Sequence, residues 1–143
     1  MSFDLKISRG DIAIGSDGDF DTVQDHEKLI QDILKMLQTP LGKNVFFPWY
    51  GSLLTDVMIG QVLDHTMTTT IIQQQIRSNL ETLQRMQRDQ LSKGQQMTPG
   101  ELLAAIQRVS VHRNTTDPTN YQIVVRVISK AFRVEEANLS VNI

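Results

Sequence analysis

The spacing of hydrophobic positions changes twice along the chain, from alternation to a helical stripe and back to alternation. Residues 3–7 alternate apolar and polar side chains, and Ile12 and Ile14 continue this alternation after the segment Arg9-Gly10-Asp11. Alternation with period two, interrupted by a glycine-containing turn, is typical of two paired strands. The beginning of the chain is therefore predicted to form a β-hairpin.

The middle of the chain carries helical stripes. One stripe follows Asp25, a residue suited to capping a helix, and stops at Pro40 and Gly42; it consists of Leu29, Ile30, Ile33, Leu34 and Leu37. A longer stripe predicts a second helix from about Thr66 to Ser92. Because its second half is mostly polar, we expect that end to project into solvent or toward a neighbour. A short helix is predicted over residues 53–59, between the first helix and the longer second helix.

Alternation returns in the last third of the chain. Val109 and Val111 alternate with polar residues, the turn-rich segment 114–120 follows, and residues 121–133 carry apolar side chains on both faces. This return strand is predicted to be central and covered on both sides. Residues 139–143 predict an apolar-faced edge strand that can pair with another chain. The whole pattern predicts an α+β fold with an N-terminal β-hairpin, two to three helices and a C-terminal antiparallel sheet.

A loop of unusual composition lies directly behind the first predicted helix. Residues 39–52 contain four aromatic side chains, although connecting loops are normally polar. Phe46, Phe47, Trp49 and Tyr50 either cap the core of the domain or contribute to a protein interface, where Trp and Tyr are enriched. Both interpretations make the loop rigid. The residues expected to fix its structure are Pro40, Gly42, Pro48, Trp49, Tyr50 and Gly51.

Length, charge and composition limit the classes of function that the chain can have. The 143 residues predict one domain with its own core, and the absence of cysteine excludes disulfides and thiolate chemistry. The formal charge of -2, without a basic run, argues against nucleic acid as a partner, and no apolar run is long enough to span a bilayer. We therefore expect neither nucleic acid nor membrane as a partner.

No sequence motif points to catalysis or to a cofactor. Asp17, Asp19 and Asp21 alternate as in a calcium loop, but Thr22 and Lys28 stand where an EF-hand needs Gly and Glu. The three histidines lie on unrelated segments. We expect no metal, no cofactor and no enzymatic activity. A pair of carboxylates drawn from Glu27, Glu81, Glu101, Glu135 and Glu136 is the alternative that spacing alone leaves open.

The residues predicted to take part in protein contacts all come from the C-terminal sheet. Arg108 offers five fixed donors on an otherwise apolar strand, with an ordinary solvated arginine as the alternative. The remaining predicted interaction residues are Ile123, Val125, Val127, Leu139, Val141 and Ile143.

The arrangement of these segments resembles that of a known family. A Gly-Asp-rich hairpin (Gly10 to Ile14) is followed by the segments Gln31-Asp32-Ile33-Leu34, Thr39-Pro40-Leu41-Gly42 and Pro48-Trp49-Tyr50-Gly51-Ser52, and by late strands around Arg108 and Val125. In this order they resemble the baseplate wedge and sheath-initiator family of contractile phage tails, which has relatives in type VI secretion baseplates and among lysozyme-like baseplate proteins. The family's Glu-Pro-Arg tripeptide corresponds here to Ile106-Gln107-Arg108, so that only the arginine matches.

The resemblance implies a structural role. A protein of this family would nucleate the contractile sheath by offering β-strands to the first sheath ring, and would join the sheath to the baseplate wedge. The implied partners are the tail sheath protein, baseplate wedge and hub proteins and the tail tube, with about six copies in a ring. The implied location is the tail baseplate of the virion, assembled in the host cytoplasm. The alternatives are a tail-associated, lysozyme-like glycosidase and a helical adaptor that docks through residues 66–92.

Overall fold

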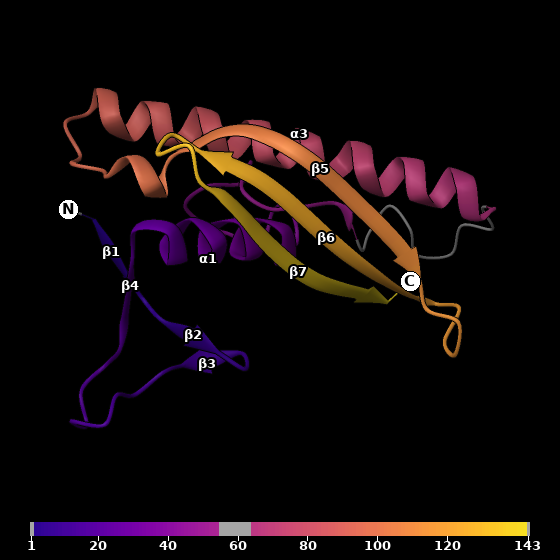
Figure 1. The fold of residues 1–143 in the computed structure, drawn as a ribbon, viewed down its shortest axis with the longest axis horizontal. Coiled ribbons are helices and arrows are strands. Elements are labelled where there is room, and N and C mark those ends of the chain that lie inside the picture. Colours follow the sequence, from indigo (N-terminus) through magenta and orange to yellow (C-terminus); the bar gives the residue numbers. More distant parts are fainter. Residues whose placement is uncertain (1, 55–63, 143) are drawn as a thin grey trace.

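The computed structural model describes residues 2–54 and 64–142, which adopt an α+β fold (Figure 1). The elements are β1 (Phe3–Leu5), β2 (Ile7–Ser8), β3 (Asp11–Ile12), β4 (Thr22–Gln24), α1 (Asp25–Gln38), α3 (His65–Ser92), the 3-10 turn η1 (Pro99–Glu101), β5 (Leu103–Arg113), β6 (Asn120–Ser129) and β7 (Val134–Asn142). An N-terminal hairpin, helices α1 and α3 and a C-terminal antiparallel sheet confirm the predicted fold class.

β6 is the central strand of the C-terminal sheet, with β5 and β7 antiparallel on either side. Ile123, Val125 and Val127 are buried on the inner face, whereas Gln122 and Arg126 are exposed on the outer face. The predicted central position is confirmed. The prediction that both faces are covered is wrong, because the outer face carries polar side chains that remain in solvent.

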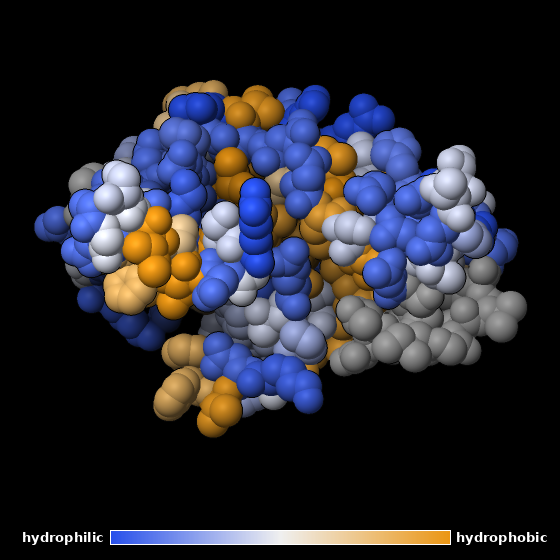
Figure 2. All heavy atoms as spheres, turned by 90° about the horizontal axis from the view of Figure 1, so that it is seen from below, coloured by the Kyte–Doolittle hydropathy of each residue, from blue (hydrophilic) through white to orange (hydrophobic). Residues whose placement is uncertain are grey.

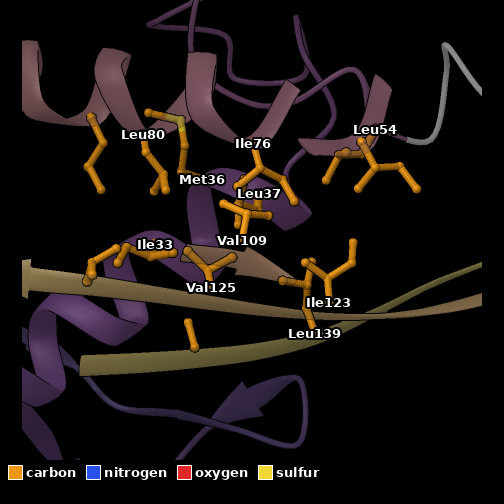
Figure 3. Packing of buried hydrophobic residues seen from close by; sticks show 14 of the residues in the cluster. Ile33, Met36, Leu37, Leu54, Ile76, Leu80, Val109, Ile123, Val125 and Leu139 are labelled. Carbon is orange, nitrogen blue, oxygen red and sulfur yellow. The ribbon is translucent and has the colours of Figure 1, made fainter. Parts of the chain in front are cut away.

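Both helices pack on the inner face of the sheet and enclose one hydrophobic core (Figure 3). Full burial of an aliphatic side chain contributes roughly 1.5–3 kcal/mol. The hydrophobic side chains with no exposed surface come from both helices and the central strand; they are Leu29, Ile33, Met36, Ile72, Ile76, Leu80, Leu83 and Val125. Their spacing along α1 and α3 is the helical stripe that the sequence predicts.

The N-terminal arm, residues 2–24, forms two small strand pairs instead of one hairpin. β2 and β3 make the predicted hairpin, with left-handed backbone at Arg9 (φ 53°) and Gly10 (φ 82°) in its turn. β1 pairs instead with β4, which the alternation does not predict because β4 is only three residues long. Gln31 of α1 holds the arm: its amide group accepts a hydrogen bond from the Ile7 N–H (2.9 Å) and donates one to the Leu5 carbonyl (2.8 Å).

The helix boundaries follow the predictions closely, but the caps differ. α1 begins at Asp25, whose carboxylate accepts a hydrogen bond from the Thr98 hydroxyl (2.8 Å) instead of capping the helix. α3 begins one residue before the predicted start and is capped by Asp64, which accepts from the Met67 N–H (2.7 Å). Residues 55–59 of the predicted short helix lie outside the described part of the chain. Neither α1 nor α3 is apolar enough over its length to cross a membrane.

The polar second half of α3 is docked on the domain, so the expectation that it projects from the fold is wrong. Gln87 is 3% exposed; its amide donates to the Glu101 carbonyl (2.9 Å) and accepts from the Leu103 N–H (2.8 Å). Gln84 donates to the Ala104 carbonyl (2.9 Å). Glutamine can both donate and accept, and it therefore replaces hydrogen bonds that the irregular start of β5 does not make in the sheet.

Candidate interaction surfaces

The two edges of the C-terminal sheet differ in how they are protected. α3 runs along β5 at one border, whereas β7 forms the opposite border (Figure 1). Besides the bonds near its start, β5 receives a hydrogen bond from Gln73 of α3 to the Val109 carbonyl (3.2 Å). Its pairing with β6 is also interrupted by two register shifts. Helix cover and bulges are established ways of protecting an edge strand, so β5 is a poor template for an added strand.

A charged side chain protects the edge of β7 only at its beginning. Glu135 faces inward, is 7% exposed in its side chain and pairs with the Arg133 guanidinium at 2.8 Å. Inward-pointing charges discourage strand addition. From Ala137 to Asn142 the strand has neither charge nor proline, and within the described ranges β6 is its only strand neighbour. We call the outer backbone edge of residues 137–142 the open edge.

The predicted interaction residues occupy three different environments. Ile123, Val125 and Val127 are core residues of the central strand, and both edges of that strand are already paired. Leu139 and Val141 also direct their side chains inward, so only their backbone lies at the open edge. Ile143 lies outside the described residues. A contact through β7 would therefore use backbone groups and the exposed side chains of the outer face.

Arg108 lies on the outer face of the sheet, exposed to solvent. Its register partner on β6 is Arg126, whose guanidinium forms an ion pair with Glu136 of β7 at 3.0 Å. Like charges directly opposite each other in a sheet are destabilising. Within the described ranges Arg108 makes no ion pair of its own. It therefore presents its donors to solvent beside a second arginine.

Residues 39–52, which we call the aromatic loop, are closed at the base of the loop by backbone hydrogen bonds. Ser52 donates to the Thr39 carbonyl (2.8 Å) and its carbonyl accepts from the Leu41 N–H (3.0 Å). Gly51 lies between them with φ 117°, and a Cβ atom there would stand 2.6 Å from the Thr39 carbonyl oxygen. Only glycine fits this position. The Asn44 side chain accepts from the N–H groups of two following residues at 3.1 Å each, which orders the tip.

Within this rigid loop only one aromatic ring reaches the core. Tyr50 packs partly buried against the core cluster, whereas Phe46, Phe47 and Trp49 are 85%, 52% and 49% exposed. The Trp49 ring lies 5.6 Å from the Phe47 ring and 6.4 Å from the Tyr50 ring, centroid to centroid. Of the two interpretations, core capping holds for Tyr50 alone, and the exposed rings fit the interface interpretation.

Other apolar side chains are exposed on the N-terminal arm. Seen from below, the surface is mainly hydrophilic and is interrupted by separate apolar patches (Figure 2). The arm contributes exposed large side chains over much of its length; they are Phe3, Leu5, Ile7, Ile12, Ile14 and Phe20.

A polar hollow of about 660 Å³ lies between β1, α1, the aromatic loop and the second half of α3. Two ion pairs line it: Lys28 to Asp32 and Lys35 to Asp4, each at 2.6 Å between Nζ and Oδ2. Neither aspartate was among the carboxylates that the sequence singled out, because they are 28 positions apart on a strand and a helix. Burial raises the pKa of Tyr50 to about 12, and the negative charges of the two aspartates add to this.

The two aspartates are shifted in opposite directions. Burial raises the pKa of Asp32 above its ordinary value, although Lys28 acts against this shift. Burial also acts to raise the pKa of Asp4, but the hydrogen bond and charge of Lys35, together with hydrogen bonds from the Leu5 N–H and Gln31, outweigh it and lower that pKa. Two carboxyl groups whose pKa values differ in this way are the kind of pair that acid–base catalysis uses. In the parts of the chain described, no group of three or more His, Asp or Glu side chains could hold a metal ion.

The fold has a counterpart among solved structures. No protein-family model and no curated protein matches the chain. The structure of the chain is similar to the crystal structure of a "putative tail lysozyme" from Geobacter sulfurreducens. The TM-score is 0.61 and the sequence identity 14%, over 82% of this chain and 89% of that chain. The two proteins share a fold. At this identity the likeness concerns the fold alone.

Proposed function

We propose that the protein is a structural component of a contractile tail baseplate that nucleates the sheath through the open edge of β7. The carrying observation is the difference between the two sheet edges. Glutamines of α3 bond the backbone of β5, whereas among the described residues no helix side chain bonds the backbone of residues 137–142, which carry no charged side chain. An exposed edge strand recognises an extended segment of another protein through backbone hydrogen bonds. The tail association in the name of the structural neighbour supports the setting.

In this proposal the remaining surfaces connect the sheath to the baseplate. The rigid aromatic loop presents Phe46, Phe47 and Trp49 to a baseplate wedge or hub protein, and Arg108 offers its donors on the outer face of β5, at the opposite edge of the sheet from the added strand. A stable joint of this kind needs about 1,200 Å² or more of buried surface in total. Strand addition alone does not supply this area, and the exposed aromatic rings are available to extend it. The tail sheath protein is the proposed partner of the open edge.

The experiment alters the open edge without touching the core. Removing residues 139–143 would also remove the buried Leu139, so lysine is placed instead at two exposed outer-face positions of β7, in the double variant N138K/S140K. Lysine on an edge strand opposes pairing with another chain. We expect this variant to fold normally and to lose sheath assembly on isolated baseplates.

The matched control places lysine on the covered edge strand, in the variant Q107K/H112K. Both positions are exposed on β5, and this double variant adds as many lysines as N138K/S140K does. This control should support sheath assembly as well as the unaltered protein does. Normal assembly by N138K/S140K, in protein shown to be folded, would contradict the proposal.

A lysozyme-like activity is the second candidate, and the polar hollow is the observation that favours it, together with the name of the neighbour. Asp32, with its raised pKa, would be the general acid, and Asp4 the ionised partner. Turbidity of a cell-wall suspension measures this activity directly. Lysis by the purified chain, abolished in both D32N and D4N, would establish the enzyme; absence of lysis at every pH tested would leave the structural proposal in place.

A further inference from the structure

Phe132 occupies a position at which an aromatic residue is costly. It lies in the turn between β6 and β7, where it is 92% exposed and has a left-handed backbone with φ 60°. The turn is closed by hydrogen bonds from the Ser129 N–H to the Arg133 carbonyl (2.9 Å) and from the Phe132 N–H to the Ser129 carbonyl (3.0 Å). Glycine is the usual residue for such a conformation, and a bulky side chain there is a genuine outlier.

Within the described parts of the molecule, no contact offsets the cost of the exposed ring or the cost of the left-handed backbone at Phe132. With 92% of its surface exposed, the Phe132 side chain gains almost no packing energy, and its ring stacks on no other aromatic ring among the described residues. Strained positions of this kind tend to persist where function requires them. The hydrogen-bonded turn also fixes the direction of the Cα–Cβ bond of Phe132, so that the backbone loses little entropy when the ring enters a binding pocket.

The surroundings of Phe132 define the chemistry of a partner. Ala131 and Val134 are exposed beside it and extend the apolar tip, while Lys130 and Arg133 add positive charge. Arg133 already pairs with Glu135. Lys130 makes no ion pair within residues 2–54 and 64–142. The tip is therefore an apolar point with a free cation next to it.

We propose that Phe132 is an anchor residue that inserts into an apolar pocket of a partner protein whose rim carries carboxylates. Aromatic side chains are enriched in interface cores, and charge complementarity with Lys130 fixes the character of the rim. This contact lies at the end of β7 opposite to Asn142 and does not depend on strand addition.

Two other occupants fit the tip less well. A second copy of the chain offers a groove between β2 and α1, lined by Lys6, Arg9 and Lys35 against the one carboxylate of Glu27. It also offers the polar hollow, whose two aspartates are already paired with lysines and whose lining carries the further cation Lys43. Both linings are positively charged on balance, so like charges would face Lys130. A membrane surface would gain one inserted ring and about 1 kcal/mol from a nearby cation, which falls short of the two strong signals that stable anchoring needs. A protein pocket is therefore the favoured occupant.

The first test measures strain in the isolated protein. F132G is compared with F46G, which removes a ring that is 85% exposed from a position without left-handed backbone. Both variants add the same flexibility to the unfolded chain, but only F132G relieves strain. We expect the Tm of F132G to exceed that of F46G by about 2–4 °C. A Tm no higher than that of F46G would overturn the argument from strain.

The second test identifies the partner. A photoreactive benzoylphenylalanine replaces Phe132 in the full chain expressed in its native host, with the same probe at the exposed loop residue Thr116 as a control. We expect one protein to cross-link from position 132 alone, through a peptide that contains apolar and acidic residues. Co-purification of that protein should fall at least tenfold with F132G or K130E and persist with F132W.

The outcomes separate this inference from the proposed sheath function. Cross-links to lipid, to a second copy of the chain, or to the same proteins as from Thr116 would each overturn the anchor. N138K/S140K should abolish sheath assembly while leaving the cross-link from position 132 unchanged. Either proposal can therefore fail alone.

Discussion

At the scale of single residues, the polar hollow contains the groups whose titration should be visible in the stability of the protein. Asp4 and Asp32 both bond a lysine at 2.6 Å, yet their side chains differ in exposure, 30% for Asp4 and 14% for Asp32. This difference decides which effect dominates. Burial prevails at Asp32 and raises its pKa, whereas at Asp4 the charge of Lys35 and the hydrogen bonds from Lys35, Leu5 and Gln31 together prevail and lower the pKa.

The two shifts predict opposite effects of pH on stability. A raised pKa means that the folded state of Asp32 binds its proton more tightly than the unfolded state does. The free energy of unfolding of the unaltered protein, relative to D32N, should therefore rise as the pH falls from neutral toward about 4. Relative to D4N it should fall as the pH drops through and below about 4, because the folded state holds Asp4 ionised.

Urea unfolding at a series of pH values measures both differences in one experiment. D32N and D4N act as controls for each other, since each removes one carboxylate from the same hollow. Parallel pH dependences for the two variants would show that the opposite shifts do not exist. The same pair of variants also serves in the lysis assay, so a change in activity can be compared directly with the change in titration.

At the scale of elements, the contact between α3 and β5 explains how a glutamine-rich helix becomes part of the core structure. The apolar stripe of α3 ends near Leu83, and glutamines continue the contact beyond that point. They bond the backbone at the start of β5, where the register with β6 shifts. A hydrophobic side chain would fill the same space but would leave those buried backbone groups without partners.

Replacing Gln87 tests this role. Q87A leaves the buried Glu101 carbonyl and Leu103 N–H without the partner that each now has, at a cost of about 2–5 kcal/mol. The control Q74A lies on the exposed side of the same helix and should change the free energy of unfolding by less than about 0.5 kcal/mol. Urea denaturation measures both. Equal stabilities for the two variants would show that Gln87 is not a bridge between α3 and β5.

The elements also show which features periodicity can predict. The helices α1 and α3 were predicted with nearly correct bounds, because each repeats its apolar stripe over several turns. The strands of the C-terminal sheet were predicted in the right order but not with the right bounds, since β5 begins at Leu103 and β7 at Val134, well before the apolar alternation on which each prediction rests. β4, with three residues, has too short a pattern to detect. The docking of Gln87 was not predicted, because a polar residue gives no sign of whether its partner is water or backbone.

At the scale of the whole molecule, the candidate surface depends on contacts that no local pattern contains. The sequence correctly predicts the apolar alternation of residues 139–141 but not that β5, the other edge of the sheet, is covered by a helix 11 or more residues away in the chain. It also cannot separate a buried aromatic side chain from an exposed one, so Tyr50 and Phe46 looked alike. The difference between an open and a covered edge arises only when the elements are assembled.

Assembly also divides the molecule into parts of unequal stability. β6 is paired on both sides and buried on its inner face. β2 and β3 are exposed along their whole length and, among the strands of residues 2–54 and 64–142, pair only with each other. The arm is attached by the buried side chain of Val23 and by polar contacts: Gln31 bonds Ile7 and Leu5, and Lys35 pairs with Asp4. Regions with little burial open locally, at a lower free energy than global unfolding.

Native-state hydrogen exchange should therefore resolve two groups of amides. We expect those of β2 and β3 to exchange at a free energy well below that of β6, which should exchange only on global unfolding. Q31A, which removes the hydrogen bonds to Ile7 and Leu5, should accelerate exchange in the arm. In Q31A, the amides of β6 should still exchange at the free energy of global unfolding, as they do in the unaltered protein. Protection of β2 and β3 equal to that of β6 would mean that the arm and the core unfold as one cooperative unit, and that its exposed apolar side chains are held in place without any partner.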